Sequence, residues 1–480
     1  MQLGNLLRPR AASPAMGTAT VWLGSAFAAL AVGVAVARGG IAWVVVGAVV
    51  GLAILPLVAE RAFEILVGWT VVTAVAYPFL RVAPYVTFDR VVVLTLAGGL
   101  ILKGRALARS RATSVMTLAF GWLVVAFGIR AAGTNISALQ TWLDAIVLPA
   151  ILFLLASRVV FTEHRCQRVG AALMAAGGAL GALGIAGKLA GFELASRTGG
   201  DLRITSEQGG GTVTRISGPY PAPEVYAVAL IVCFAATLYW VLSRPSTSRW
   251  VVAGTAMALE LTGLTLTLFR AGWVGGVIVV IAAFGLRPKR FGRIFAVAAA
   301  IAAIGLAGTT QLSHNQTFET RFKNTDNVQG RLATYVESTK IFASAPIFGV
   351  GVNQYSRAAP SFETVTFGGV AAVNFPHSSY FGMLAEQGLF GFLPLIACTF
   401  AVWYLLRVFR RRARTKHDVI LAAATVGATL GYLLMSVTLT MLPYGPSNAF
   451  FALLLGMVAG RCDAVSASEE EPRRPVAAAR

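Results

Sequence analysis

The feature that most constrains this chain is a series of apolar runs, each about 15–25 residues long, that recurs from end to end. A run of this length matches one helical crossing of a bilayer. Of the 480 residues, 56% are hydrophobic and only 12% are charged. This composition excludes an ordinary soluble enzyme, a disordered chain and a secreted disulfide scaffold. We therefore expect an all-α polytopic membrane protein.

The apolar runs predict about 14 transmembrane helices, within a range of about 12–14. Two of them, 250–269 and 271–287, are separated by a single charge, so this division rests on Arg270 alone. The sequence contains no internal repeat of the kind that many transporters have. The predicted spans are 19–37, 40–59, 62–80, 88–103, 114–131, 136–160, 169–192, 222–243, 250–269, 271–287, 291–309, 379–406, 418–438 and 446–460.

The spans divide the chain into five parts. A loop as long as 310–378 is usually functional or a small domain, so we expect the catalytic part there. Within it, apolar residues recur at helical spacing from Asn324 to Ala345, which predicts a short helix that ends at Pro346. The parts are a tail at 1–18, helices 1–11 within 19–309 with an outer loop at about 192–221, the large loop 310–378, helices 12–14 within 379–460, and a tail at 461–480.

The distribution of basic residues predicts the orientation of the helices. Lysine and arginine gather in alternate loops, at 103–111, 158–168, 287–293 and 407–416. Loops rich in these residues stay in the cytoplasm, so both termini are expected inside and the loop 310–378 outside. The formal net charge of +20 is then largely topological and requires no nucleic-acid partner.

The cysteines and the first apolar run fit this topology. Two cysteines fall on cytoplasmic segments (Cys166, Cys462) and two within spans (Cys233, Cys398), so we expect no structural disulfide. Residues 35–37 resemble a signal-peptide cleavage site, but we favour an uncleaved first helix.

Four residues on the predicted outer side require an explanation, because outer loops are depleted of arginine. Arg215 precedes a span in a turn rich in glycine and proline, and Arg270 lies between two apolar runs. Arg331 lies near the start of the predicted surface helix, and His377 lies where the long loop re-enters the membrane. Each residue also has an ordinary structural explanation: an arginine can extend to the membrane interface, and a histidine can simply form hydrogen bonds.

Together, the four residues indicate transfer chemistry with a phosphate leaving group. Arginine binds phosphate oxygens through a planar fork and stays charged when partly buried, so three arginines suit a pyrophosphate. A histidine nearby can take a proton from an attacking hydroxyl group. The outer carboxylates are scattered, and no phosphate-binding glycine loop or metal-ligand spacing occurs. We therefore expect neither a metal nor a cofactor.

Several short motifs carry a resemblance to a known family. Their order and spacing over residues 213–392 resemble the O-antigen ligase / O-antigen polymerase superfamily, whereas the N-terminal half matches it only in hydropathy. The motifs are Arg215–Gly218, Phe269–Gly272, Gly330–Arg331, Pro346–Gly351, Pro376–Tyr380 and Glu386–Gly391.

The resemblance implies a metal-independent glycosyltransferase with a GT-C-like fold in the bacterial cytoplasmic membrane. Such an enzyme takes a glycan from an undecaprenyl-pyrophosphate carrier at the outer face and passes it, with inversion, to a hydroxyl of an acceptor glycan, lipid or protein. It also implies that Arg215, Arg270 and Arg331 hold the pyrophosphate and that His377 activates the acceptor. A polymerase and a ligase differ only in the acceptor, and the motifs do not separate them.

The alternative function is that of a polytopic transporter or flippase. Such a protein would favour ionisable residues within its spans, and Glu260 is nearly alone there.

The chain departs from the family pattern at three positions. Ser378 follows the histidine where asparagine is usual, and Phe269 precedes the second arginine where serine is usual. Glu224 stands where the first arginine motif commonly continues with asparagine. All three lie beside predicted site residues, so we expect them to influence the acceptor pocket.

Overall fold

The computed structural model describes most of the chain as two compact units. One unit comprises residues 1–69 and 79–106, and the other comprises residues 70–78 and 107–480. The predicted spans 19–37 and 291–309, most of 40–59, the tail 1–18 and the last ten residues lie outside the described part. The described residues are 55–76, 81–83, 86–102, 109–190, 206–208, 211–213, 215–285, 326–362 and 364–470.

The first unit contains two short apolar helices and a small hairpin. Helices α3 (Ala62–Ala76), which ends in the other unit, and α4 (Phe88–Leu102) are 15 residues long each and coincide with the predicted spans 62–80 and 88–103. Strands β1 (Arg81–Ala83) and β2 (Val86–Thr87) pair antiparallel before α4. The indole Nε1 of Trp69 donates to Asp89 Oδ1 at 2.8 Å, which ties α3 to the first turn of α4.

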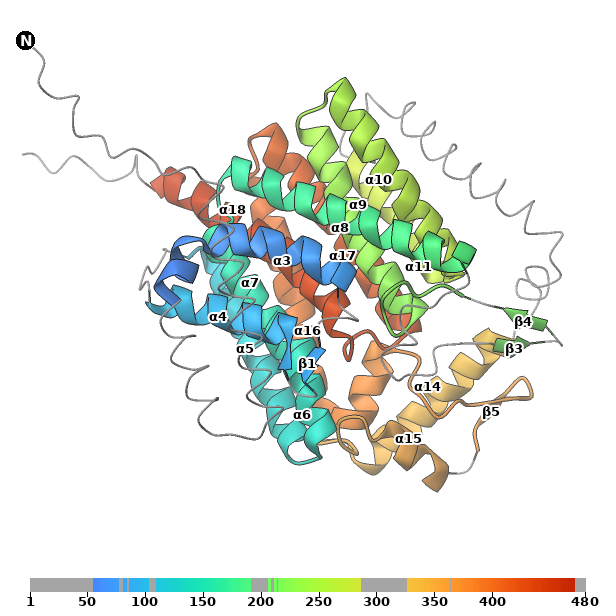
Figure 1. The fold of residues 1–480 in the computed structure, drawn as a ribbon. Helices are drawn as coiled ribbons and strands as arrows, with labels where there is room; N and C mark the ends of the chain where they lie inside the picture. Colours follow the sequence, from blue (N-terminus) through green and yellow to red (C-terminus); the bar gives the residue numbers. More distant parts are fainter. Residues whose placement is uncertain are drawn as a thin grey trace, which may run out of the picture. The chain divides into compact units, whose positions relative to one another are not determined.

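The second unit is a bundle of long helices (Figure 1). Its elements alternate between apolar helices and short turns, as the hydropathy pattern predicts. The helices in chain order are α5 (Arg111–Ala132), α6 (Ile136–Trp142), a π-helical turn η1 (Leu143–Val147), α7 (Leu148–Val159), α8 (Glu163–Ala190), α9 (Pro223–Ser243), α10 (Thr247–Leu266), α11 (Arg270–Gly285), α14 (Asp326–Ser344), α15 (Tyr355–Ala358), a 3₁₀ turn η4 (Ala359–Ser361), α16 (Ser379–Arg412), α17 (Lys416–Thr438) and α18 (Gly445–Glu470). The hairpins are β3 (Ser206–Gln208) with β4 (Gly211–Val213), and β5 (Thr366–Phe367) with β6 (Val370–Ala371).

Seven helices in the described part of the chain are long and apolar enough to cross a membrane. They are α5, α6 to α7 as one continuous segment, α8, α9, α16, α17 and α18, and each coincides with a predicted span. The predicted break between 250–269 and 271–287 is present, because α10 ends at Leu266 and α11 begins at Arg270. The all-α membrane class is thereby supported, whereas the count of about 14 spans stays a prediction.

Helix α9 is the centre of the bundle. It packs against α8, α10, α11, α17 and α18, and 94% of its most apolar window is buried. A helix that is apolar on all sides belongs in the interior of a large protein or a membrane bundle. The first turn of α9 therefore places its side chains among several neighbouring helices at one end of the bundle.

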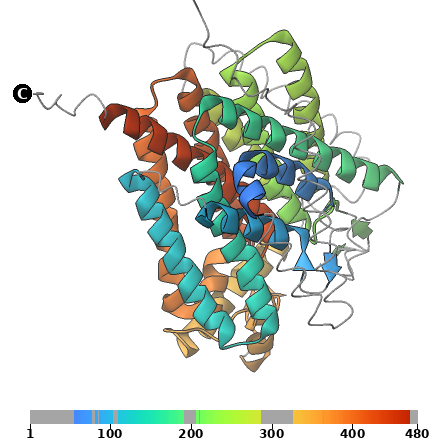
Figure 2. The same cartoon turned by 60° about the vertical axis from the view of Figure 1, so that its left-hand side comes forward.

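The elements between α11 and α16 form a small subdomain at that end, which we call the α14 end (Figures 1 and 2). The predicted surface helix is present as α14, which packs on α16 and on the β5–β6 hairpin. A core of Ile341, Tyr355, Ala359 and Ala385 joins α14, α15, η4 and α16. The described part of the long predicted loop, from residue 326 onward, thus folds as a compact support on α16.

The family motif at Pro346–Gly351 forms a backbone clasp on a break in α16. The helix is interrupted at Gly388, which has φ 61°. Val350 and Gly351 donate to the carbonyls of Ala385 and Glu386 at 3.0 and 2.8 Å. In the other direction, Leu389 and Phe390 donate to the carbonyls of Pro346 and Ile347, each at 2.9 Å. Backbone groups freed by a broken helix at membrane depth need such partners.

Close approach explains why the clasp contains glycine. A Cβ atom at Gly349 would lie 2.3 Å from the backbone of Glu386, and one at Gly388 would lie 2.5 Å from the carbonyl oxygen of Ile347. Both residues also have positive φ, which side chains disfavour. Two of the motifs that carry the family resemblance are therefore explained by backbone packing.

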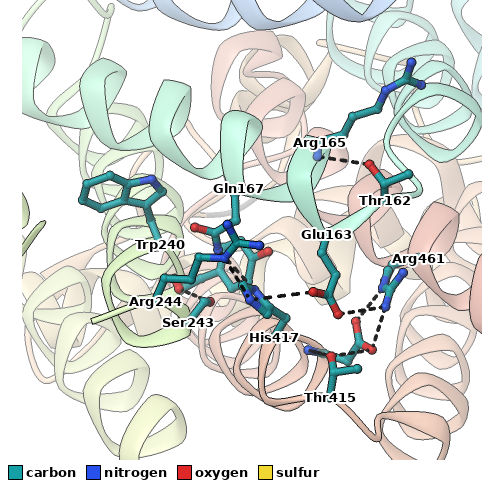
Figure 3. Close-up of polar contacts among 12 residues, drawn as sticks. Thr162, Glu163, Arg165, Gln167, Trp240, Ser243, Arg244, Thr415, His417 and Arg461 are labelled. Atoms are coloured by element: carbon teal, nitrogen blue, oxygen red, sulfur yellow. Dashed lines mark hydrogen bonds and ion pairs between the residues drawn. The ribbon is translucent and has the colours of Figure 1, made fainter. Parts of the chain in front are cut away.

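At the opposite end of the bundle, charged residues from four helices form an ion-pair cluster (Figure 3). Arg461 of α18 contacts Asp418 at 2.7 Å and Glu163 at 3.2 Å, and Glu163 lies 3.8 Å from His417. Arg249 donates to Gln167 at 2.8 Å. We define the ion-pair cluster as Glu163, Gln167, Arg244, Arg249, His417, Asp418 and Arg461. Arg461 lies just beyond the predicted span end at 460, and α18 continues to Glu470.

The four cysteines are free and buried in the structure. They lie on α8, α9, α16 and α18, within the bundle rather than on the α14 end.

Candidate functional site

Arg215 is fixed at the start of the turn that leads into α9. Its Nε donates to the carbonyl of Thr267 at 2.8 Å, and the next backbone N–H, of Ile216, donates to the carbonyl of Leu266 at 3.3 Å. The first arginine motif is therefore joined directly to the end of α10, three residues before Arg270. Sequence positions 55 residues apart become neighbours in this way.

Arg270 is the first residue of α11 and is exposed. The three residues between α10 and α11 make a tight turn in which Leu268 has φ 52°, an uncommon conformation for a residue with a side chain. The N-terminus of a helix carries a partial positive charge and unpaired N–H groups, which favour anions. An arginine at this position adds to that positive potential, so the arrangement favours a negatively charged ligand.

Arg331 lies in the second turn of α14 and is half-buried. Burial lowers the pKa of its guanidinium, and the positive charges of Arg215 and Arg270 lower it further, while Tyr335 and Glu224 oppose this. These mutual effects require the three arginines to lie within electrostatic range of one another. The structure thus brings together three of the residues that the sequence singles out.

His377 lies immediately before α16, whose N-terminus is capped by the Ser378 side chain. Backbone and side-chain bonds from this segment to the end of α17 hold it in place: Ser379 N donates to Leu439 O at 3.1 Å, and Thr440 donates to Pro376 O. Burial lowers the pKa of His377 to about 4, and the charge of Arg331 contributes to this lowering. Its Nδ1 has no hydrogen-bond partner within the described residues. The imidazole is therefore neutral at pH 7 and has an unoccupied nitrogen.

The sequence marks Glu224 as a departure from the family pattern but does not pair it with Arg215. Its carboxylate lies 2.6 Å from Arg215 Nη1, and the two side chains are only 8% and 7% exposed. The carboxylate also influences the pKa values of Arg331 and His377. The ion pair with Arg215 therefore makes Glu224 part of the site rather than an isolated carboxylate. Its departure from the family pattern was the signal in the sequence, but a single sequence did not connect it to Arg215.

Tyr335 is a second residue that the sequence placed only on a helical face. Its hydroxyl donates to the carbonyl of Val437 at 2.8 Å, and its ring stacks on Phe381 at 4.7 Å between centroids. Burial raises the pKa of its hydroxyl, whereas the charge of Arg331 lowers it. Tyr335 thereby ties α14 to α17 and α16 beside the segment that carries His377.

We define the arginine site as Arg215, Glu224, Arg270, Arg331 and His377. It combines three guanidinium groups with one carboxylate and a neutral imidazole, so it carries excess positive charge. Such a set can bind a multiply charged anion and accept one proton. Among the described residues, no three His, Cys, Asp or Glu side chains lie close enough together to hold a metal ion.

The fold defines a helical membrane protein with the arginine site at the α14 end of its bundle. Residues 255–396 match the family model described as O-antigen ligase. This match supports the resemblance to the O-antigen ligase / O-antigen polymerase superfamily that the motifs carry, over residues 255–396. The match covers Arg270, Arg331 and His377 but not Arg215. No curated protein matches the chain significantly.

Proposed function

We propose that the protein is a metal-independent, inverting membrane glycosyltransferase that uses an undecaprenyl-pyrophosphate-linked glycan as donor and a hydroxyl group as acceptor. It would act at the outer face of the bacterial cytoplasmic membrane, as either a surface-polysaccharide polymerase or a ligase. The family match supports a membrane role in glycan ligation or polymerisation. The observation that carries the finer proposal is the convergence of Arg215, Arg270 and Arg331 beside a neutral His377.

In the proposed reaction, the arginines bind the pyrophosphate of the donor. The acceptor oxygen attacks the anomeric carbon as the bond from that carbon to the pyrophosphate oxygen breaks, and the acceptor proton passes to His377. The lipid pyrophosphate leaves with the bonding electron pair, and its added charge is stabilised by the guanidinium groups. A single displacement of this kind inverts the anomeric centre. The histidine later releases its proton to water.

Donor binding would also raise the pKa of the general base, His377. The low pKa of His377 arises first from burial and then from Arg331. A bound pyrophosphate would neutralise part of that positive charge, so the pKa of the imidazole would rise toward the operating pH. A general base is most effective when its pKa lies near that pH.

The test is an in vitro reaction of the purified protein with a lipid-linked oligosaccharide. Wild type is expected to shift the glycan to a longer or newly attached product, whereas His377→Ala is expected to lose about 10²–10⁴-fold in rate. Equal product from the two proteins would remove His377 from the mechanism. Arg357→Ala serves as a control, since Arg357 is an exposed residue of α15 outside the arginine site.

Deletion of the gene distinguishes the two arms of the family. Loss of a polymerase should leave single repeat units on the lipid carrier, whereas loss of a ligase should leave long lipid-linked chains. An unchanged carrier pool would contradict both.

A further inference from the structure

An elongated cavity lies within the bundle, and the arginine site does not use it. It encloses about 840 Å³ of space, its opening included, between α5, the η1–α7 segment, α16, α17 and α18. We call it the α17 cavity. Its lining runs along α5 from residue 116 to 123, along α17 from 429 to 436 and along α18 from 448 to 455, a rise of about 10 Å on each helix.

The walls of the α17 cavity present an apolar surface. Thr399 and Thr429 donate to backbone carbonyls of their own helices, four residues earlier. Tyr432 donates to the side chain of Asn448 at 2.7 Å, and its ring stacks on Phe451 at 4.6 Å between centroids. Because these polar groups are bonded within the protein, the cavity suits an apolar chain rather than a polar molecule.

One hydroxyl group at the α14 end of the cavity differs from the others. Ser436 lines the cavity and is only 3% exposed, yet its Oγ has no hydrogen-bond partner in the described part of the chain. A buried polar group without a partner is costly, so such a group calls for an explanation. A polar atom at the head of a bound chain would supply the missing partner. The cavity therefore suits a molecule with an apolar chain and a polar head, with the head at the α14 end.

The α14 end of the cavity lies beside the segment that carries His377. Ser379 and Tyr380, which follow His377 by two and three residues, both line the cavity. The hydroxyl of Ser379 donates to the carbonyl of Leu439, so this segment is fixed against the end of α17. A head group held at this end of the cavity would therefore lie close to the proposed general base.

Helix α17 separates the cavity from the helices of the arginine site. One face of α17 packs on α9 and α11: a Cβ atom at Gly431 would lie 3.4 Å from both Gly275 and Ile231. The α17 residues that line the cavity lie on the other face of that helix, and they are Thr429, Tyr432, Leu433 and Ser436. Since Arg270 begins α11 and Glu224 lies in the first turn of α9, the cavity lies across α17 from both helices.

We propose that the α17 cavity holds the apolar chain of a lipid-anchored acceptor, whose head group then lies beside His377. This inference rests on the proposed function and identifies the acceptor as a lipid-linked molecule rather than a protein or a free glycan. In the proposed reaction the arginines bind the pyrophosphate of the donor, whereas the acceptor gives its proton to His377. A chain on the His377 side of α17 is therefore assigned to the acceptor.

The cavity would act by positioning the acceptor. A lipid chain gains no hydrophobic free energy when it moves from the bilayer into an apolar cavity, because both surroundings are apolar. A chain held along α17 does fix the distance and direction of its head group. Correct placement of the reacting groups is worth much of an enzymatic rate, and a misplacement of about 1 Å can cost about 10²-fold.

The experiment compares two forms of the acceptor in the in vitro transfer reaction with labelled lipid-linked oligosaccharide as donor. One form is the glycolipid fraction from membranes of the deletion strain, and the other is the water-soluble glycan released from that fraction. Leu395→Trp places a larger side chain in the cavity. We expect it to lower kcat/KM for the glycolipid form at least about tenfold, with transfer to the soluble form unchanged.

The donor is the same in both arms, so the comparison separates donor from acceptor. Affinity for undecaprenyl pyrophosphate, the leaving group of the donor, should stay within about twofold in Leu395→Trp. Equal losses with both acceptor forms, or weaker binding of undecaprenyl pyrophosphate, would assign the cavity to the donor chain and overturn the proposal. Unchanged transfer to the glycolipid form, or wild-type transfer to soluble or protein acceptors alone, overturns it as well.

Leu393→Trp is the matched control. Leu393 lies on the same helix, two residues before Leu395, but it is 50% exposed and does not line the cavity. The same substitution there should leave transfer to both acceptor forms unchanged. A loss equal to that of Leu395→Trp would show a general effect of tryptophan on α16 and would overturn the assignment to the cavity.

A second variant decides the case if Leu395→Trp does not fold. Ala452→Leu fills the cavity from α18 with a smaller side chain, so transfer to the glycolipid form should fall at least about threefold. Unchanged transfer in this variant overturns the proposal. If wild type forms no product with any acceptor, the proposed function fails together with this inference. If wild type is active and neither cavity variant changes its use of the glycolipid, only this inference fails.

Discussion

The arginine site and the ion-pair cluster both combine arginines with carboxylates and a histidine. They lie at opposite ends of α9, which is about 30 Å long. In the ion-pair cluster, Arg461 meets two carboxylates, Asp418 and Glu163, and further arginines bond to glutamine and histidine. In the arginine site, the carboxylate of Glu224 pairs with Arg215 and acts on Arg331 through its charge. With neutral histidines, the formal charge is +1 for the cluster (three arginines, two carboxylates) and +2 for the site (three arginines, one carboxylate), so the site keeps more positive charge for a ligand. Stability and function therefore separate between the two ends.

The largest effect is expected on stability, from a variant that breaks the ion-pair cluster. Arg461→Ala leaves Asp418, which is 2% exposed, without its closest cationic partner. Loss of one member of a buried pair costs about 3–5 kcal/mol. We expect a clear fall in the thermal unfolding midpoint in detergent, with pyrophosphate affinity of the folded protein unchanged.

Arg414→Ala is the matched control for this prediction. Arg414 contacts Glu469 at 2.8 Å in the same part of the molecule, but its side chain is 78% exposed. An exposed pair contributes about 0–1 kcal/mol. A midpoint that falls equally in the two variants would show that burial does not distinguish them.

The next effect concerns the arginine site. Arg331→Lys keeps the charge but replaces the planar fork with a point charge, so we expect the rate of glycan transfer to fall about 10–100-fold. The unfolding midpoint should change little, because lysine keeps both the positive charge and a long aliphatic stem at this half-buried position. Arg357→Lys, on the exposed face of α15, should leave the rate unchanged. Full activity of Arg331→Lys would mean that charge alone suffices at this position.

A smaller effect is expected from a variant of Tyr335, which supports the arginine site. Tyr335→Phe removes the hydrogen bond to the carbonyl of Val437 and keeps the ring stacked on Phe381. A neutral hydrogen bond contributes about 0.5–1.5 kcal/mol, so the unfolding midpoint should fall slightly and transfer should fall less than about tenfold. A loss as large as that of His377→Ala would give Tyr335 a direct role in the reaction.

Much of the fold follows from sequence because membrane helices are specified locally. Hydropathy and length alone predict the seven long spans that the structure describes. The basic segment 407–416 was expected as a loop, but α16 continues to Arg412 and α17 begins at Lys416. The break at Arg270 was also predicted, since a charge between two apolar runs is costly within a helix at membrane depth. The clasp between Pro346–Gly351 and α16 was not predicted, because it depends on backbone groups that meet only after folding.

Part of the arginine site was also predicted, because its arginines give a signal in the local sequence. Arginines on the predicted outer side stand out against a known depletion, so Arg215, Arg270 and Arg331 were found one by one. Glutamate has no such depletion in outer loops, and nothing in the local sequence of Glu224 reveals that it faces Arg215 across the start of α9. Which acidic residue pairs with which basic one is set by tertiary packing, and a single sequence does not contain it.

The smallest expected effect, and the sharpest test of the neutral imidazole, is the pH dependence of transfer at limiting donor. His377 acts as a base only when it is unprotonated, and its pKa is lowered to about 4. Between pH 7 and pH 5, the neutral fraction should fall by only about a tenth, whereas an unperturbed histidine with a pKa of about 6.5 would lose most of it. Because kcat/KM reports the pKa of the free enzyme, this quantity should stay within about twofold over that range. The unfolding midpoint is measured at each pH, so that loss of folded protein is separated from titration of the site. A fall of tenfold or more in kcat/KM by pH 5, in protein that stays folded, would show that the imidazole is solvated like an ordinary surface histidine. The contrast between the arginine site and the ion-pair cluster would then rest on the arginines alone.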